Sequence, residues 1–179
     1  MKNYLRFVVL LSVFYSCLLY DVNAKSSKGV NKLSLGGRYY AEQEDFPEIP
    51  FGDGDVAYGV AYEYHESAAA WQLAATYCPD VTGDDAVDYI ITPEVNLIVK
   101  DGIWRGGIGM LYSYLERDDH AADDDEWVGP YWQLLFGLNI PFFGMDLKAL
   151  TYYDFESFND LDEFELDKLD YGVWVSFSF

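Results

Sequence analysis

The stretch that decides the fold is VAYGVAYEYH, residues Val56–His65. From Val56 onward, large apolar or aromatic residues take every second position and alternate with small residues or with the carboxylate of Glu63. Alternation with a period of two residues predicts a β-strand whose two faces differ in chemistry. The stretch is longer than the usual globular strand of about five or six residues. Its length matches that of a tilted strand crossing a lipid bilayer.

Seven further stretches have the same strand-like character. In one of them Trp71 and Leu73 alternate with Gln72 and Ala74, which again separates large apolar groups from small or polar ones. The predicted strands cover residues 32–40, 56–65, 70–78, 88–99, 103–114, 131–140, 145–154 and 170–179.

The connections between these strands alternate in length. Residues 65–69, 100–102 and 141–144 form short connections, whereas 41–55, 78–88, 115–129 and 155–170 form long ones. A meander with one trimmed and one elaborated rim has this order, and outer-membrane barrels combine it with an even number of strands. The sequence therefore predicts an all-β fold, an eight-stranded antiparallel up-and-down transmembrane β-barrel.

Charge is distributed unevenly over this plan. The chain has 31 acidic and 11 basic residues, a formal net charge of −20. Most acidic residues lie in the long connections and the adjoining strand ends, which contain Arg117 and Lys168 as their only basic residues. Such a surface repels phosphate, the reverse of the basic footprint that nucleic-acid binding needs, so we expect no nucleic-acid partner.

Charged and amide side chains inside the predicted strands are expected to face the lumen. An Arg or Lys that faced lipid at mid-membrane would cost about 2–4 kcal/mol, so these groups belong on the inner face with the small residues. The expected lumen polar network consists of Arg38, Glu63, Gln72, Glu94, Asn96, Arg105, Asp146 and Lys148. An eight-stranded barrel has an interior that side chains can fill, which favours a polar plug. A narrow, cation-preferring channel is the alternative, because an acidic mouth concentrates cations.

The first 24 residues have the pattern of a secretory signal peptide. Lys2 and Arg6 precede an apolar run over residues 7–20, and Val22 and Ala24 occupy the small-residue positions of a cleavage site. We expect cleavage after Ala24 and one barrel domain over residues 25–179. Cys78 is the only cysteine in that domain, so no intramolecular disulfide is expected.

Aromatic residues gather at both ends of the predicted strands, where a membrane barrel has its two interface belts. The belt at the long-connection ends is expected to contain Tyr39, Tyr77, Tyr89, Tyr112, Tyr114, Trp127, Tyr131, Trp132, Tyr153 and Tyr171. The belt at the short-connection ends is expected to contain Trp71, Trp104, Phe142, Phe143, Phe177 and Phe179.

The signal peptide, the eight strands, the acidic long connections and the terminal VWVSFSF (residues 173–179) resemble the small eight-stranded outer-membrane barrels of the OmpX and OmpA transmembrane-domain type. The resemblance implies a place in the outer membrane of a Gram-negative bacterium, among lipid and lipopolysaccharide. It also implies that the barrel-assembly machinery reads the last strand. Because function on such scaffolds resides in loops, we separately expect an extracellular partner, not identified by the sequence, at the long connections.

Catalysis and tight metal binding are not expected. His65 falls beside a short connection, where it would face the periplasm, and His120 falls in a long connection on the opposite side, so they cannot cooperate. The acidic run lacks the ligand spacing and the turning glycine of an EF-hand, which leaves only weak Ca²⁺ or Mg²⁺ association and no cofactor. The expected surface-interaction residues are Asp118, Asp119, His120, Asp123, Asp124, Asp125 and Glu126.

These features predict a non-enzymatic outer-membrane barrel with a structural or surface-interaction role in adhesion or envelope integrity. The second alternative to this function, besides the channel, is a soluble lipocalin-like carrier of an apolar ligand. That class has an apolar interior and a polar exterior. Here the large apolar residues form the continuous face and the small and charged residues form the other, which favours lipid on the outside.

Overall fold

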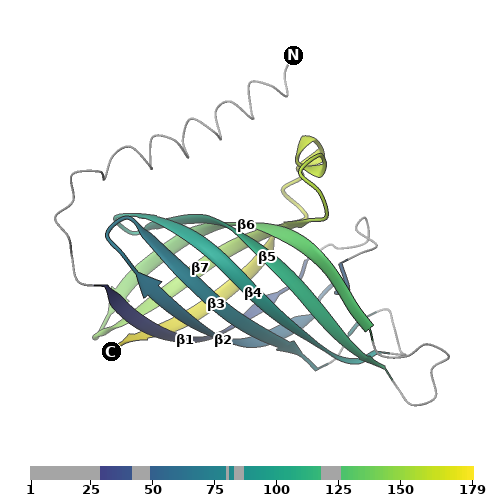
Figure 1. Cartoon of the computed structure of the whole chain (residues 1–179), viewed down its shortest axis with the longest axis horizontal. Helices are drawn as coiled ribbons and strands as arrows, with labels where there is room; N and C mark the ends of the chain where they lie inside the picture. Colours follow the sequence, from purple (N-terminus) through teal and green to yellow (C-terminus); the bar gives the residue numbers. More distant parts are fainter. Residues whose placement is uncertain (1–28, 42–48, 80, 83–86, 118–125) are drawn as a thin grey trace.

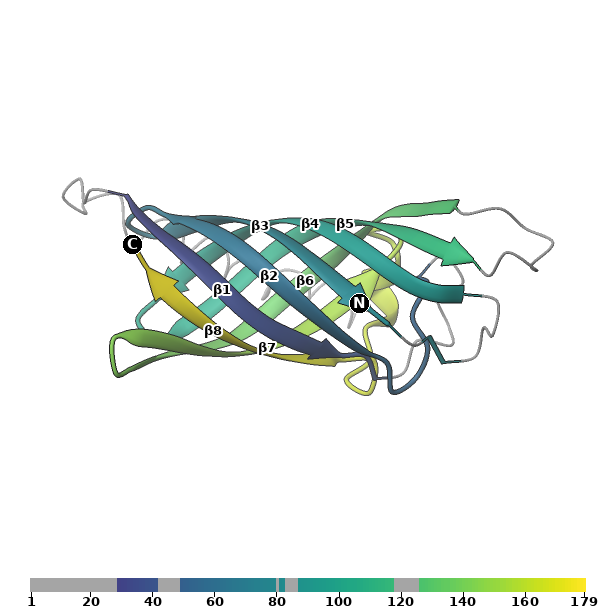
Figure 2. The ribbon, with the colours of Figure 1, turned by 90° about the horizontal axis from the view of Figure 1, so that it is seen from below.

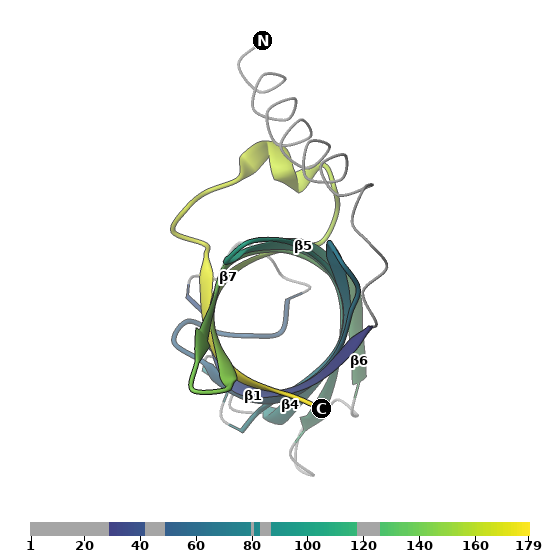
Figure 3. The same ribbon diagram turned by 90° about the vertical axis from the view of Figure 1, so that its left-hand side faces the viewer.

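A computed structural model describes residues 29–41, 49–79, 81–82, 87–117 and 126–179 of the chain. Eight antiparallel strands form a closed barrel in which each strand pairs with its sequence neighbours and β8 pairs with β1 (Figures 1 and 3). The strands are β1 (Val30–Tyr39), β2 (Val56–His65), β3 (Ala69–Cys78), β4 (Val87–Asp101), β5 (Trp104–Arg117), β6 (Glu126–Phe142), β7 (Met145–Phe155) and β8 (Asp170–Ser178). The predicted fold class is confirmed. Within the described residues, no helix has the length and apolarity needed to cross a bilayer.

The two faces of the wall are arranged as the alternation in β2 predicts. Tyr58 and Val60 are 61% and 50% exposed, whereas Glu63 on the opposite face is 1% exposed. Large apolar side chains thus cover the outside of the cylinder, whereas the charged side chain of Glu63 faces the inside. This arrangement is the reverse of the soluble ligand carrier that was the alternative.

The short turns between β2 and β3, β4 and β5, and β6 and β7 all lie at one end of the barrel, the short-turn rim. The other four connections begin and end at the opposite end, the long-loop rim. The three short connections thus share one end of the barrel and the four long connections share the other, as the alternation of their lengths predicts. At the seam, the backbone N–H of Phe179 donates to the carbonyl of Asn31 at 3.1 Å, so the last residue is held against β1.

The hairpin of β5 and β6 is longer than the sequence predicts. We expected residues 126–129 to be a loop and β6 to begin at 131, but β6 begins at Glu126, and that expectation is wrong. The glycine and proline at 129 and 130 suggest a turn, yet the strand continues through them with a register shift between Leu111 and Ser113 of β5. Beyond this shift Trp127 stacks on Tyr112 with ring centroids 5.0 Å apart. The hairpin and β4 extend past the rest of the long-loop rim (Figure 2).

Two members of the predicted aromatic belt are not exposed at the interface. Tyr131 is fully buried inside the barrel, because it shares its face of β6 with Gln133. Tyr153 points outward but is covered by the connection between β7 and β8. That connection, residues 156–169, carries the short 3-10 helix η1 (Asp160–Glu163) and lies outside the barrel wall (Figures 1 and 3).

Candidate functional site: the barrel interior

Arg38 is the centre of a buried ion cluster near the long-loop end of the bore. Its Nη2 lies 2.6 Å from Oδ2 of Asp170 and 2.7 Å from Oδ1 of Asp154, and its Nη1 donates to Oε1 of Gln133 at 3.0 Å. All four side chains are buried. A buried guanidinium requires such compensation, since an unpaired charge in this environment is costly.

The aromatic rings beside Arg38 complete its surroundings. The guanidinium carbon lies 4.6 Å from the ring centroid of Tyr40 and 4.3 Å from that of Tyr152, which are cation–π distances. The phenol of Tyr152 in turn accepts a hydrogen bond from Nε1 of Trp174 at 2.9 Å. Strands β1, β6, β7 and β8 are thereby tied together around one cation.

Amide side chains continue the network along the bore. Nε2 of Gln133 donates to Oδ1 of Asn96 at 2.7 Å and to Oε2 of Glu94 at 3.0 Å, and Nδ2 of Asn96 donates to Oε1 of Gln72 at 2.7 Å. The row requires a glycine beside it, because a Cβ built on Gly109 would lie 1.7 Å from Oδ1 of Asn96.

Glu63 is the centre of a second ion cluster, nearer the short-turn rim. It forms an ion pair with Lys148, accepts a hydrogen bond from Nε2 of Gln72 at 2.8 Å and contacts Nε2 of His65 at 2.6 Å. Ser34 donates to Oε1 of Glu63 at 3.3 Å. The carboxylate thus has partners on β1, β2, β3 and β7, and the hydrogen-bonded chain runs from Arg38 to His65.

The rim residues among the predicted set lie apart from this network. Asp146 forms an ion pair with Lys32, and both are partly exposed. Nη1 of Arg105 donates to the carbonyls of Gly102 and Trp104 at 2.9 and 2.7 Å, so this guanidinium stays at the short-turn rim. Arg105 nevertheless lines a small pocket together with Glu63, His65, Gln72, Ile98, Lys148 and Leu150.

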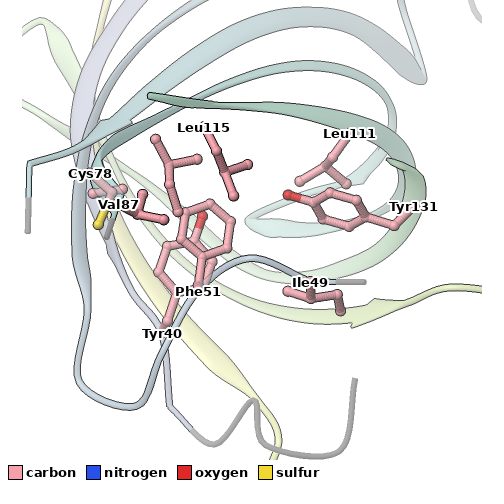
Figure 4. Packing of buried hydrophobic residues seen from close by; sticks show 10 residues of the cluster. Tyr40, Ile49, Phe51, Cys78, Val87, Leu111, Leu115 and Tyr131 are labelled. Carbon is pink, nitrogen blue, oxygen red and sulfur yellow. The ribbon is translucent and has the colours of Figure 1, made fainter. Parts of the chain in front are cut away.

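An apolar cluster, here called the mouth plug, closes the long-loop end of the bore (Figure 4). Part of the β1–β2 connection folds back across the bore, as Figure 3 shows, and its Phe51 stacks on Tyr40 with centroids 3.8 Å apart. Asp55 holds this fold-back, accepting hydrogen bonds from the backbone N–H of Gly52 and of Thr82, both at 2.8 Å. The mouth plug consists of Tyr40, Ile49, Phe51, Ala57, Cys78, Val87, Ile90, Leu111, Leu115 and Tyr131.

A second apolar layer lies deeper in the bore, around Trp174. Its indole occupies space that Gly36 and Gly59 leave open, since a Cβ on either glycine would come within 2.6 or 2.8 Å of the ring. The layer consists of Ala61, Ala70, Ala74, Ile98, Leu135, Leu150, Tyr152 and Trp174. Together with the ion clusters, these layers fill the described interior with side chains.

Several interior groups were not expected from the sequence. Asp154 and Asp170 were grouped with the loop charges, and His65 was expected to face the periplasm; all three are buried in the bore, so both expectations are wrong. The two aspartates adjoin an acidic connection in the sequence, so they were assigned to that connection and not to the strands. Their alternation with Lys148 in β7 and with Trp174 in β8 is the signal that could have placed them inside.

Of the expected surface-interaction residues, the structure describes Glu126 alone. Residues 118–125, which include His120, lie outside the described residues. Glu126 is exposed and accepts a hydrogen bond from Nη2 of Arg117 at 2.7 Å, which joins the first residue of β6 to the last residue of β5. Among the described residues, no group of three or more His, Cys, Asp or Glu side chains could hold a metal ion.

The closed cylinder with a charged interior and an apolar exterior defines this chain as a small eight-stranded barrel of the outer-membrane type. No protein-family model matches the sequence. A search of curated proteins likewise finds no significant match.

Solved structures show the same architecture. The N-terminal β-barrel domain of Pseudomonas aeruginosa OprF matches with a TM-score of 0.54 and 15% sequence identity, covering 87% of this chain and all of that one. Neisserial surface protein A matches with a TM-score of 0.49 and 10% identity over the same shares. At these identities the likeness to OprF concerns the fold alone.

Proposed function

We propose that the protein is a non-enzymatic, integral outer-membrane barrel of a Gram-negative bacterium, exported by its amino-terminal signal peptide. The apolar exterior supports this location. Side chains such as Leu73, Phe136 and Val173 are exposed, and soluble monomeric proteins rarely expose an apolar surface that extends around a whole barrel. In the membrane the same groups face lipid, and the long-loop rim faces the cell exterior.

The closed bore is the observation that carries the proposed role. Arg38 and Gln133 are buried in the lumen, and the mouth plug covers its long-loop end. No solvent path is therefore favoured, and the working surfaces lie outside the cylinder. The buried cluster also gives little support to catalysis. Glu63 stands between Ser34 and His65, and it contacts both, which is not the serine–histidine contact of an activated nucleophile.

The projecting β5–β6 hairpin is the surface best suited to an extracellular partner. Trp127 is exposed and contacts the rings of Tyr112 and Tyr114, with centroids 5.0 and 5.2 Å apart. Pairing of β6 with β7 begins only at Trp132, so the hairpin extends beyond the β7 edge. In sequence these three aromatic residues adjoin the acidic run at 118–125. The combination suits a partner with a basic and partly apolar surface.

The location and the closed bore can be tested together. Detergent extracts should contain a heat-modifiable band on gels, whereas recovery in the soluble periplasmic fraction would contradict the proposed location. In planar bilayers the refolded barrel should give no conductance steps. Cation-selective steps would instead support the channel alternative.

The surface role is tested by removing charge from the acidic run without changing its length. Cells displaying the protein should bind to an immobilised cationic peptide, and replacing the five aspartates between 117 and 126 by asparagine should abolish that binding. Replacing the same aspartates by glutamate is the matched control and should preserve it. Equal binding by all three forms would exclude the acidic run as the contact.

A further inference from the structure

The connection between β7 and β8, here called the lateral loop (residues 156–169), lies beside the barrel wall instead of over its mouth (Figures 1 and 3). Beneath it, the outward-facing Tyr153 and Phe155 of β7 are only 1% and 0% exposed. On the same outer face of β7, Leu147 is exposed. The loop therefore covers the part of the wall where β7 approaches the long-loop rim.

Aromatic contacts hold the lateral loop in this position. The ring of Phe158 lies 5.2 Å from that of Trp132 and 5.3 Å from that of Phe155, and the ring of Phe164 lies 4.6 Å from that of Tyr153. These are distances at which aromatic pairs contribute beyond their buried area. The loop is anchored to two neighbouring strands, since Trp132 belongs to β6 and the other two partners to β7.

A local turn shapes the loop ahead of η1. Oδ2 of Asp160 accepts a hydrogen bond from the backbone N–H of Ser157 at 2.7 Å, and Oδ1 accepts one from its hydroxyl at 3.0 Å. The backbone N–H of Asp160 donates to the carbonyl of Ser157 at 3.0 Å. The side chain of Phe158, between these residues, is thus presented from a defined turn.

The lateral loop still exposes large apolar groups after it has packed. Phe158, Phe164 and Leu166 are 55%, 42% and 71% exposed. Through the contact of Phe158 with Trp132, this surface adjoins the apolar outer face of β6, where Phe136 is exposed on the same side of the strand as Trp132. Exposed carboxylates at Glu165 and Asp167 lie beside these groups, so the segment is amphipathic.

We propose that the lateral loop lies in the boundary between headgroups and acyl chains of the outer leaflet, with Phe158, Phe164 and Leu166 in contact with lipid chains. This inference rests on the proposed membrane location. Continuity with the apolar outer face of β6 identifies lipid as the occupant. Phe and Leu are also among the residues that interfacial segments bury at this depth.

A fluorescent probe at Leu166 tests the proposal. The L166C variant is labelled with the environment-sensitive dye NBD and reconstituted in phosphatidylcholine vesicles that contain nitroxide lipids. Leu166 is mostly exposed, so its replacement spares the packing of the loop on β7, and Cys78 is fully buried and should not compete for the label. We expect blue-shifted emission, and quenching by headgroup-level nitroxides several-fold stronger than for a D53C control in the exposed β1–β2 turn.

A V60C label on the outer face of β2 separates the two proposals. If V60C is quenched by deep nitroxides and L166C behaves like D53C, the lateral-loop proposal is overturned and the membrane barrel stands. If V60C is not quenched either, the membrane location itself fails. If L166C is shielded from lipid quenchers, with shielding that increases with the protein-to-lipid ratio, a second copy of the chain covers the loop and the lipid proposal is overturned.

Discussion

Replacing Arg38 by methionine is expected to destabilise the barrel by about 3–5 kcal/mol, the usual cost of removing one partner from a buried ion pair. The side chain is buried, with Nη2 2.6 Å from an oxygen of Asp170 and 2.7 Å from one of Asp154. Methionine has a similar length and fills much of the space. The loss therefore comes chiefly from two buried carboxylates that no longer have a cation, and not from a cavity.

The measurement is urea unfolding of the barrel refolded in detergent micelles, followed by tryptophan fluorescence and extrapolated linearly to zero denaturant. The matched control is the triple variant R38M/D154N/D170N, which removes the carboxylates along with the cation and should recover most of the lost free energy. An R38M variant within about 1 kcal/mol of wild type, the value of an exposed ion pair, would refute the assigned role. A triple variant no more stable than R38M would refute the explanation by uncompensated charge.

Two further predictions concern packing in the bore and at its mouth. G107A should lose about 1–3 kcal/mol of unfolding free energy, because its Cβ would lie 2.4 Å from a backbone carbonyl oxygen of β4. G106A is the control, because the nearest atom to its Cβ would be 3.9 Å away. Equal losses of unfolding free energy in the same urea assay would contradict the packing argument. D55A should loosen the mouth plug by removing the acceptor for two backbone N–H groups, and maleimide should then label the buried Cys78 faster in the folded protein. Unchanged labelling would show that Asp55 does not hold the plug.

The barrel was predictable because its wall is built from local alternation. Each strand carries its own two-residue period, and the position of Glu63 opposite Tyr62 and Tyr64 decides which face is the interior without any long-range information. The alternation of short and long connections then indicates which connections lie at the same end of the barrel. The interior placement of Glu63 follows from the same period, because it alternates with large apolar neighbours. That of Lys148 was assigned partly from its charge, because one of its neighbours is the small Ala149.

The mouth plug was not predictable from periodicity. Ile49 and Phe51 lie in a connection rich in acidic residues, and a short apolar segment without a repeat does not indicate whether it faces solvent or folds back. Its position depends on tertiary contacts: stacking of Phe51 on Tyr40, and the hydrogen bonds of Asp55 to a loop distant in sequence. The lateral loop escaped prediction for the same reason, since no periodic pattern in residues 156–169 indicates that Phe164 packs on Tyr153.

The interior also selects the register of the seam between β1 and β8, where the sheet closes. In the observed register Gly36 is paired with Trp174 and Ser34 with Ser176, whose hydroxyls lie 2.6 Å apart. A slip by one residue would turn the indole toward lipid. A slip by two would keep the faces but place the indole against Arg38 or Ser34, positions that lack the space Gly36 provides. The lipid-facing side chains of β8 are all large and apolar or aromatic (Tyr171, Val173, Val175 and Phe177), so they distinguish such registers poorly. The observed register of β1 and β8 is therefore favoured over slipped registers by Gly36, by the Ser34–Ser176 pair and by the ion clusters in the bore.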